Sequence, residues 1–534
     1  MNRKYDVIII GGGVTGVGIA RDLAMRGAKV LLLERYDLAS GATGRSHGLL
    51  HSGGRYVVKD PESAAECARE NKILRKIAGH IIDDTGGLFV KLKEDSDDYL
   101  EKFLKGCKAT GVVHKELTRK ETFEMEPNLS RTIDYAVYVN DGAIDPFKLA
   151  FLNALDAVNM GAEILTYHEV IGFIIKQNEV LGVKVRDNIN NIIEEYYSDV
   201  VVNAAGAWIG KIGEMANVEI PVRPSKGSLI IFSRKIFRMV INRLRMPSDG
   251  DIFVPSYSTT ILGTTSINVD DPDTFYSTPE EILKLYKEGS KVFPDLYKIR
   301  PIRSFAGPRP LVGGTGREAK RTFTIIDHEE TDSLIGLVTI GGGKLTTYRL
   351  MAEKLSDLVA EKLGLSKTCK THKYPLPGYY DKSEMKKIIK NMKGFKSGVI
   401  EAIRRWGSIS REFLISDNSS LICLCEKVSQ AEITYVIRKM KAKTIGDVMR
   451  RTRASMGPCQ GQNCIYKIAG LLMGHTQHYR NLFFDDFVSH LRKRWSNIRL
   501  LAYGGLADQE ALTAAIYNLL GNYNLLVRRY ENSK

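Results

Sequence analysis

The stretch Tyr5-Asp6-Val7-Ile8-Ile9-Ile10-Gly11-Gly12-Gly13-Val14-Thr15-Gly16 decides the fold class. Its first half is an apolar run rich in β-branched residues, which is typical of a strand buried on both faces. The glycines that follow have the spacing G-x-G-x-x-G, at Gly11, Gly13 and Gly16. In a strand-turn-helix unit they permit a tight turn, let a pyrophosphate approach the backbone and let the helix pack closely on the strand.

The residues after these glycines complete a dinucleotide-binding unit. A helix-period segment ends around Arg26-Gly27, and a second strand, residues 29–33, leads to Glu34. The N-terminus of the helix would hold an anion, and Glu34 lies where a ribose hydroxyl is accepted. We therefore predict an α/β, Rossmann-like domain, although Glu34 and Arg35 alone do not decide between FAD and NAD.

Length and composition limit the other function classes. The chain has 534 residues, 43% of them hydrophobic, and a net charge of +15. The basic residues are spread along the chain and no nucleic-acid module signature is present, so we expect no nucleic-acid partner. No segment resembles the run of about 18 apolar residues that a bilayer span requires. We expect a cytoplasmic protein without a transmembrane segment, for which a peripheral position on the inner membrane face stays open.

Four later segments carry further motifs: D-L-A-S-G-A-T-G-R-S-H-G-L-L-H-S-G-G-R-Y at 37–56, V-V-N-A-A-G-A-W at 201–208, S-F-A-G-P-R-P-L at 304–311 and G-G-G-K-L-T-T-Y-R at 341–349. Three of them resemble motifs of the FAD-dependent glycerol-3-phosphate dehydrogenases, and residues 201–208 resemble the wider D-amino-acid-oxidase-like flavoproteins. The similarity covers nearly the whole chain. It is greatest to the A subunits of the anaerobic enzymes, which end in a cysteine module of the bacterioferritin-associated-ferredoxin type.

This resemblance implies FAD as the cofactor and a fold of the D-amino-acid-oxidase/glutathione-reductase type, with an α+β substrate domain and a small helical four-cysteine module at the C-terminal end. The expected segments are 1–60, 146–210 and 331–365 for FAD, 61–145 and 211–330 for the substrate, 366–415 for a helical linker, 416–474 for the cysteine module and 475–534 for a tail. The expected FAD contacts are Gly11, Gly13, Thr15, Gly16, Glu34, Arg35, Ser40, Gly41, Thr43, Gly44, His47, Gly48, Leu49, Val170, Ala205, Gly206, Gly342, Gly343, Lys344, Leu345 and Thr346.

A phosphorylated alcohol as substrate calls for cations and a base. Arginine suits the phosphate because its planar fork binds oxyanions at two points. We predict His51, Arg309 and Lys344 as catalytic residues, and as substrate-binding residues Arg55, Tyr56, Arg309, Arg321, Lys344 and Thr347. Taken alone, Arg321 is more readily explained as a surface cation.

The general base is the least determined of these roles. The ordinary pKa range of histidine suits proton removal near neutrality, and His51 matches the family histidine. The alternative is that His47 or His51 only hydrogen-bonds the flavin.

Further along, residues 341–344 precede a helix-like stretch at 345–358, and a helix N-terminus there would stabilise negative charge on the reduced ring. An ordinary glycine turn is the alternative for that segment.

Four of the seven cysteines form a separate pattern. Cys423 and Cys425 give C-x-C, and Cys459 and Cys464 follow after 33 intervening residues as C-x4-C. Four thiolates suit a [2Fe-2S] cluster or structural zinc, and the resemblance favours the cluster. Two short helical segments with N-cap signatures, at Ser429 and Thr444, would bring the two pairs together. The other three cysteines, Cys67, Cys107 and Cys369, are expected to be buried side chains.

Together these features imply oxidation of sn-glycerol-3-phosphate to dihydroxyacetone phosphate, with electrons leaving through the cysteine module to a quinone or another acceptor. We expect electron-transfer partner subunits and an oligomer. The main alternative is an FAD-dependent L-2-hydroxy acid or amino/imino acid dehydrogenase of the same flavoprotein group, in which one carboxylate would need fewer cations than a phosphate dianion. A non-enzymatic FAD-containing protein would be expected to lack Arg309 or Lys344.

Overall fold

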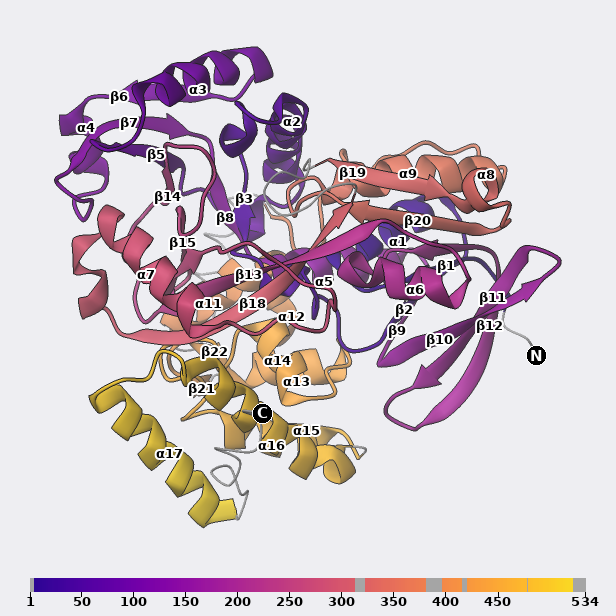
Figure 1. The fold of residues 1–534 in the computed structure, drawn as a ribbon. Coiled ribbons are helices and arrows are strands. Elements are labelled where there is room, and N and C mark those ends of the chain that lie inside the picture. The colour runs from indigo at the N-terminus through magenta and orange to yellow at the C-terminus, as the bar shows by residue number, and fades with distance from the viewer. Residues whose placement is uncertain (1–3, 313–321, 381–395, 415–419, 478, 522–534) are drawn as a thin grey trace.

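The strand before the glycine motif lies inside an eight-stranded sheet in the computed structural model, which describes residues 4–312, 322–380, 396–414, 420–477 and 479–521 (Figure 1). The parallel strands run in the order β9-β2-β1-β12-β20, with the bounds β9 Glu163–Thr166, β2 Val30–Glu34, β1 Lys4–Ile10, β12 Ile192–Asn203 and β20 Leu337–Gly342. Antiparallel strands complete it: β10 His168–Lys176, β11 Glu179–Asp187 and β19 Phe323–Asp327. The predicted Rossmann-like fold class is confirmed.

Both faces of this sheet are covered, which explains the continuous apolar run of β1. Val7 and Ile9 pack against helices on one face, whereas Ile8 and Ile10 belong to a second core beneath β10 and β11. The helices of the first face are α1 Val14–Arg26, α5 Pro146–Asn159 and α9 Tyr348–Lys362. A buried parallel strand reads as apolar at every position because neither face meets water.

A second, nine-stranded sheet is largely antiparallel and lies beside the first (Figure 1). Its strands are β17 Ile267–Asn268, β13 Val222–Phe232, β16 Thr259–Gly263, β15 Ile252–Ser256, β14 Val240–Arg243, β5 Gly87–Leu92, β7 Ile133–Val139 and β6 His114–Leu117, with β18 Pro301–Val312 paired to β13. A small sheet joins the two, from β3 Leu49–Leu50, β8 Gly142–Ile144 and β4 Ile82–Asp83. The remaining helices of this half are α2 Pro61–Ile77, α3 Asp97–Thr110, α4 Arg119–Met125, α6 Ile209–Met215, α7 Pro279–Val292 and α8 His328–Asp332.

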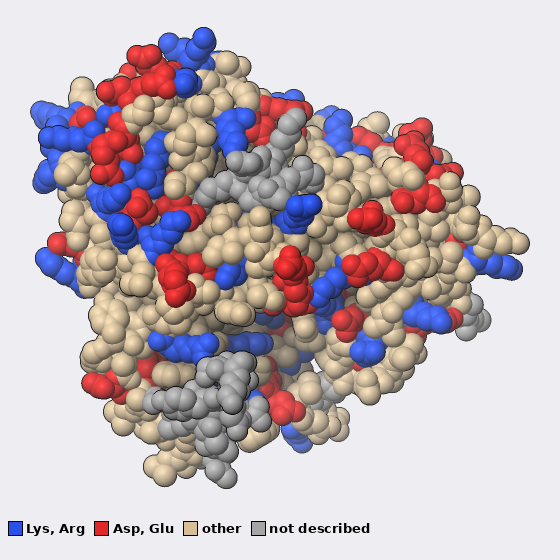
Figure 2. Space-filling model, in the orientation of Figure 1, with Lys and Arg blue, Asp and Glu red and all other residues tan. Residues whose placement is uncertain are grey.

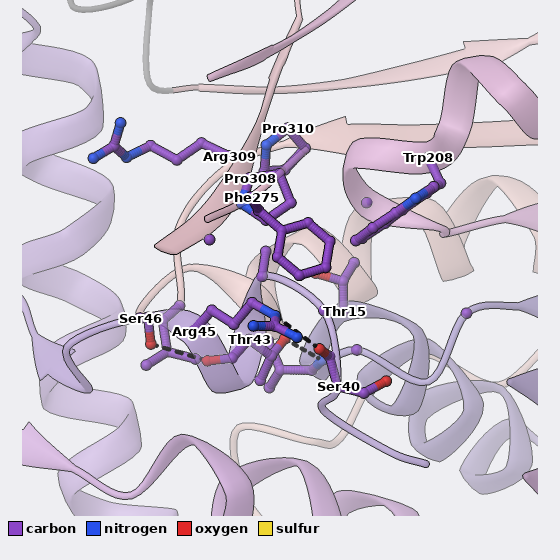
Figure 3. Close-up of a pocket in the computed structure, with 18 of the residues that line it drawn as sticks. Thr15, Ser40, Thr43, Arg45, Ser46, Trp208, Phe275, Pro308, Arg309 and Pro310 are labelled. Atoms are coloured by element: carbon purple, nitrogen blue, oxygen red, sulfur yellow. Dashed lines mark hydrogen bonds between the residues drawn. The ribbon is translucent and has the colours of Figure 1, made fainter. Parts of the chain in front are cut away.

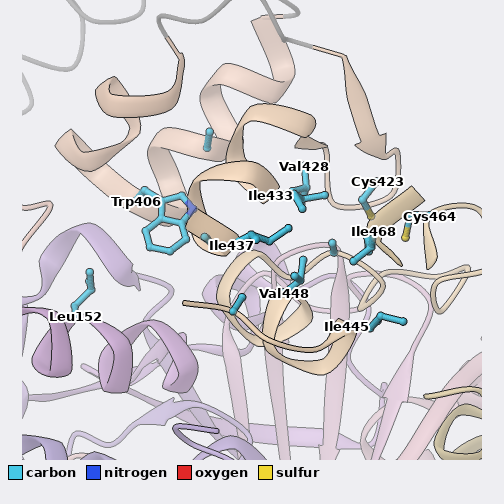
Figure 4. Packing of buried hydrophobic residues seen from close by; sticks show 14 of the residues in the cluster. Leu152, Trp406, Cys423, Val428, Ile433, Ile437, Ile445, Val448, Cys464 and Ile468 are labelled. Atoms are coloured by element: carbon cyan, nitrogen blue, oxygen red, sulfur yellow. The ribbon is translucent and has the colours of Figure 1, made fainter. Parts of the chain in front are cut away.

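The cysteine module follows the linker and shares its core with the first domain. It comprises β21 Leu421–Cys423, β22 Val428–Ser429, α13 Gln430–Arg438, α14 Ile445–Thr452 and α15 Ile465–His475. One continuous hydrophobic cluster contains Ile433 and Val448 of the module together with Leu152 of α5 and Trp406 of the linker (Figure 4). The helix N-caps expected at Ser429 and Thr444 are present, since each side chain accepts a backbone N–H three residues later.

Several segment boundaries differ from expectation. The helix after the Gly341 segment begins at Tyr348 rather than Leu345, because residues 344–347 form a turn. The expected helical linker contains α11 Lys396–Trp406 and α12 Arg411–Leu414, but residues 366–380 are turns and irregular backbone, and residues 381–395 and 415–419 lie outside the described residues. Strand β19 pairs with β20, although the expected substrate segment extended to residue 330.

The C-terminal segment, expected to be a mixed tail, is helical in its described part. Helix α16 Tyr479–Ile498 packs against β18, and α17 Gly505–Gly521 follows it (Figure 1). Across the described residues no helix combines the length and apolar character that a bilayer span requires. On the face shown in Figure 2, basic and acidic side chains are interspersed.

Candidate active site and four-cysteine module

A large cavity of about 1090 Å³ lies between the two sheets and the cysteine module. The predicted residues that line it are Gly11, Gly13, Thr15, Glu34, Arg35, Ser40, Gly41, Thr43, His47, Leu49, His51, Arg55, Tyr56, Val170, Ala205, Gly206, Arg309, Gly342, Gly343, Lys344 and Leu345. Five other predicted site residues are described by the structure but do not line the cavity: Gly16, Gly44, Gly48, Thr346 and Thr347. Arg321 lies outside the described residues.

The glycine motif at the end of β1 leaves room for a ligand and for close packing. Gly11 has a φ of +112°, which favours glycine, and a Cβ there would lie 2.6 Å from the carbonyl oxygen of Ala204. A Cβ on Gly16 would lie 2.0 Å from the carbonyl oxygen of Gly11, so this glycine lets α1 approach the strand. Gly13 faces the cavity at the N-terminus of α1, where free backbone N–H groups can hold a pyrophosphate. The glycine turn at Gly11–Gly13 and the N-terminus of α1 therefore form a cradle that fits a dinucleotide.

Glu34 at the end of β2 is held in place by the backbone. Its two carboxylate oxygens accept hydrogen bonds from the backbone N–H groups of Gly12 at 2.7 Å and Tyr36 at 2.9 Å. Burial raises the pKa of this carboxyl. Each oxygen keeps a second lone pair, so Glu34 can still accept a ribose hydroxyl from the cavity.

The wall beside Glu34 includes residues that were not predicted from the sequence. Asp273 accepts hydrogen bonds from Arg35 at 2.9 Å and from the Trp208 indole at 2.8 Å. Figure 3 shows Trp208 beside Phe275, whose ring contacts the guanidinium of Arg45. Trp208 and Arg45 lie within the motif segments, whereas the segment with Asp273 and Phe275 has no motif.

At the other end of the cavity, His51, Tyr56 and Lys344 cluster. The backbone N–H of His51 donates to Thr346 Oγ1 at 3.0 Å, and the rings of His51 and Tyr56 lie 5.4 Å apart. Lys344 Nζ lies 5.1 Å from the centre of the Tyr56 ring and donates to Ser63 Oγ at 3.1 Å. Thr346 thus orients the histidine from behind the lining.

Two arginines from different elements also line the cavity, and both lie close enough to His47 to act on it electrostatically. Arg55 donates to the buried carboxylate of Asp251 at 2.9 Å, and its Nη1 is buried without a hydrogen-bond partner. Arg309 on β18 donates through Nη2 to the Thr265 carbonyl at 2.7 Å and through Nη1 to Ser266 Oγ at 3.3 Å. Protein groups already engage both terminal nitrogens of Arg309, so its charge is the main means by which it could act on an anion in the cavity.

His47 also lies within this end of the cavity. Burial, with the charges of Arg309 and Arg55, lowers the pKa of His47 to about 3, so its ring is neutral near pH 7. Its Nε2 is buried without a hydrogen-bond partner. An orphaned ring nitrogen that faces the cavity fits hydrogen bonding to a polar heterocycle such as a flavin, and so supports the fit of FAD.

The four cysteines come together as two pairs. Cys464 donates a hydrogen bond to Cys423, and this lowers the pKa of the Cys423 thiol to about 6; Cys425 and Cys459 form the second pair. The backbone N–H groups of Glu426 and Ser455 also donate to the Cys423 sulfur, as is usual around iron-sulfur ligands. Figure 4 shows Cys423 and Cys464 side by side.

The spacing of the pairs bears on which metal they hold. Among the described residues, no three of these sulfur atoms lie within 4.8 Å of one another. A zinc ion bound by four sulfurs at about 2.3 Å would bring all of them to about 3.8 Å from one another. Two separate pairs suit a two-iron cluster, in which each iron takes two thiolates. The remaining cysteines, Cys67, Cys107 and Cys369, are buried, as expected.

Comparison with known proteins agrees with this geometry. The family model "FAD dependent oxidoreductase" matches residues 6–358, and "BFD-like [2Fe-2S] binding domain" matches residues 421–473. The A subunit of the anaerobic glycerol-3-phosphate dehydrogenase of Escherichia coli (strain K12) is 41% identical over 526 residues, which cover 97% of this chain and 96% of that protein. The chain belongs to the FAD-dependent glycerol-3-phosphate dehydrogenase family.

Two further members extend this comparison. The A1 subunit of the anaerobic glycerol-3-phosphate dehydrogenase of Haloferax volcanii is 43% identical over 530 residues, which cover 96% of this chain and 90% of the relative. The structure of the glycerol-3-phosphate dehydrogenase from Bacillus halodurans, complexed with FAD, has a TM-score of 0.73 and 24% identity over 94% of this chain and 96% of that one. FAD and the [2Fe-2S] cluster are therefore the cofactors of this family member.

Proposed function

We propose that this chain oxidises sn-glycerol-3-phosphate to dihydroxyacetone phosphate and passes the electrons through its [2Fe-2S] module to an acceptor outside the chain. One observation carries the proposal: His51 and Lys344 both lie against Tyr56, and Arg55 and the dinucleotide cradle line the same cavity. Relatives that are similar over at least 96% of this chain are named as glycerol-3-phosphate dehydrogenases. When bound, FAD supplies a two-electron acceptor for the hydride from C2 of the substrate.

Substrate binding depends on three cations that enter from separate elements. Asp251 fixes Arg55 so that its unpartnered Nη1 is available to a phosphate oxygen. Lys344 contributes a mobile ammonium, and Arg309 adds charge from the strand β18. A phosphate dianion calls for several such groups, whereas one carboxylate would leave part of this charge unbalanced. The cation set therefore favours a phosphorylated alcohol over a 2-hydroxy acid.

We assign proton removal from the C2 hydroxyl to His51. A general base works best when its pKa lies near the operating pH. With a pKa of about 3, His47 is a poor base and is better suited to hydrogen bonding with the flavin. The Thr346 contact to the His51 backbone and the Asn71 amide, which donates to the His51 carbonyl at 3.0 Å, hold the residue in position.

The module lies between the cavity and the surface. Ser455 lines the cavity, and its backbone N–H donates to the sulfurs of Cys423 and Cys464. Leu424, which precedes Cys425 in the chain, is 65% exposed. This arrangement supports electron entry near Ser455 and exit near Leu424. Because the relatives are named as A subunits, we propose partner subunits at the exit side, with a quinone as the candidate final acceptor.

Anaerobic mixing of the FAD-loaded protein with candidate substrates tests the assignment. We expect glycerol-3-phosphate to bleach the flavin absorbance, with formation of one dihydroxyacetone phosphate per flavin. Glycerol serves as the matched control, because it keeps the alcohol and lacks the phosphate. Bleaching by an L-2-hydroxy acid or an amino acid, with glycerol-3-phosphate inert, would refute the substrate assignment.

A further inference from the structure

One part of the cavity is lined by basic side chains that the proposed reaction does not use. They come from the loop after β2, from strand β18 and from helices α14 and α16, and they are Arg45, Arg303, Arg450, His490, Lys493 and Arg494. The region borders the cysteine module, because Ser455 and Gln460 of that module line the same cavity.

Acidic residues balance only some of these charges. Arg450 pairs with Asp37 at 2.9 Å and with Asp447 at 2.8 Å, and Arg494 pairs with Glu510 at 2.8 Å. Within the part of the chain that the structure describes, Arg45, Arg303 and Lys493 have no carboxylate at salt-bridge distance, although Asp486 acts on Lys493 from further away. The excess of positive charge is therefore concentrated on these three side chains.

The three residues also have little hydrogen bonding of their own. Arg303 Nε is buried without a partner. Arg45 donates through Nε to the Ser40 carbonyl at 3.2 Å and lies over the Phe275 ring. Arginine and lysine side chains carry several donors, and a buried donor without an acceptor costs free energy. An acceptor that enters the cavity would remove this cost.

Burial and mutual repulsion act on the whole group. Burial lowers the pKa of Arg303 to about 10; burial together with Arg303 and Arg450 lowers that of Arg45 to about 10. Lys493 is exposed overall, more so than the two arginines, yet its pKa is also lowered by burial and by Arg450. His490 is neutral, since burial and the surrounding cations lower its pKa to about 3. A bound anion would offset this repulsion.

This region is separate from the proposed substrate phosphate site. Arg303 and Arg309 lie six residues apart on the strand β18, which corresponds to about 20 Å at 3.3 Å per residue. Gly307 lies between them, and a Cβ there would be 2.6 Å from Arg45 Cβ. Arg45 thus stands between the two arginines, and one phosphate cannot contact both Arg303 and Arg309.

We propose that Arg45, Arg303 and Lys493 form a second anion site, which binds a phosphate group that belongs neither to the substrate nor to FAD. Two arginine forks and one ammonium suit the three terminal oxygens of a phosphate. The phosphate can be inorganic or part of an organic phosphate monoester. The site borders the cysteine module, because a Cβ on Gly461 would lie 3.0 Å from Ser455 Cβ and 3.7 Å from His490 Nε2.

Equilibrium binding to the FAD-loaded full chain tests this site. Inorganic phosphate and AMP are the probes, and saturating dihydroxyacetone phosphate fills the substrate site. We expect one equivalent of phosphate to stay bound, and Arg303→Gln or Lys493→Gln to weaken that binding at least tenfold with unchanged FAD content. Arg492→Gln is the matched control, because Arg492 is exposed on the same helix outside the cavity lining.

The outcomes separate this site from the other functions of the cavity. Tighter binding of AMP than of phosphate identifies an organic ligand, equal binding identifies free phosphate, and either result supports the site. Complete displacement by dihydroxyacetone phosphate, or loss of FAD from both variants, would overturn it, because the cations would then serve the substrate or the flavin pyrophosphate. A wrong substrate assignment appears separately, as flavin that glycerol-3-phosphate does not bleach.

Discussion

Arg451 at the end of α14 binds the carboxylate of Asp37 with both terminal nitrogens, at 2.7 and 2.8 Å. Asp37 begins the D-L-A-S-G segment that leads into the cavity, and Arg451 belongs to the cysteine module. Both side chains are almost fully buried, and Arg450 donates to the same carboxylate. The ion pair therefore fixes the position of the module relative to the dinucleotide cradle.

Replacement of Asp37 by Asn should destabilise the protein by about 3–5 kcal/mol, because it leaves the buried Arg451 without its salt-bridge partner. The free energy of unfolding in denaturant measures this effect. Asp98→Asn is the control, since Asp98 forms an exposed pair with Lys102 that is worth at most about 1 kcal/mol. Equal effects of the two substitutions would contradict a structural role for the Asp37 pair.

The two histidines of the H-G-L-L-H segment should differ in the pH dependence of flavin reduction. A base must be deprotonated, so the rate should fall as the pH drops below the pKa of that base. His51→Gln should lower the rate about 100- to 10,000-fold and remove this acidic limb. The His47→Gln variant should keep the fall in rate at low pH, because a group with a pKa of about 3 stays neutral from pH 5 to 9. Stopped-flow measurements between these pH values check both; a limb that disappears only in His47→Gln would reverse the assignment.

Gly227 is expected to control Arg309. An added Cβ would lie 2.3 Å from Arg309 Nη2, so Gly227→Ala must displace the guanidinium. Arg309→Ala should cost about 3 kcal/mol or more in kcat/KM, and Gly227→Ala at least half of that, with normal FAD content. The control is Gly172→Ala, where an added Cβ meets no atom within 4 Å. Full activity of Gly227→Ala beside an impaired Arg309→Ala would show that the position of the guanidinium is unimportant.

Loss of one cysteine should separate the two half-reactions. The parent should contain about two iron and two acid-labile sulfide per chain. Cys459→Ser should leave flavin reduction by the substrate largely intact and slow electron delivery to the acceptor. Cys107→Ser, a buried cysteine outside the module, is the control for loss of a thiol. Stoichiometric zinc without iron in anaerobically prepared parent protein would disprove the cluster ligation.

Local signals in the sequence were sufficient for the cradle and for singling out the four clustered cysteines. The Gly11 motif, the strand before it and Glu34 are close in sequence, and their spacing determines their geometry. The N-caps at Ser429 and Thr444 likewise depend on residues three positions away. The start of α9 was misplaced because the apolar pattern begins at Leu345, whereas the Thr347 side chain closes a turn onto Lys344 first.

Contacts between distant segments had no such signal. Asp37 and Arg451 are far apart in the sequence, and neither residue type indicates its partner. Lys493 belongs to the segment 475–534, for which the sequence predicts only a tail. Helix α16 instead packs on β18 and brings this segment to the cavity. Only the folded structure shows that Arg303 and Lys493 line the same cavity.

The hydrophobic cluster that joins Ile433 and Val448 of the module to Leu152 of α5 has a consequence for the speed of electron transfer. A carrier on a loose tether must diffuse between donor and acceptor, so its turnover slows as the solvent becomes more viscous. Here one hydrophobic cluster contains side chains of both the module and the first domain. The distance that an electron crosses inside the chain is therefore fixed once folding is complete. Solvent viscosity can then affect only the encounter with substrate and with the external acceptor.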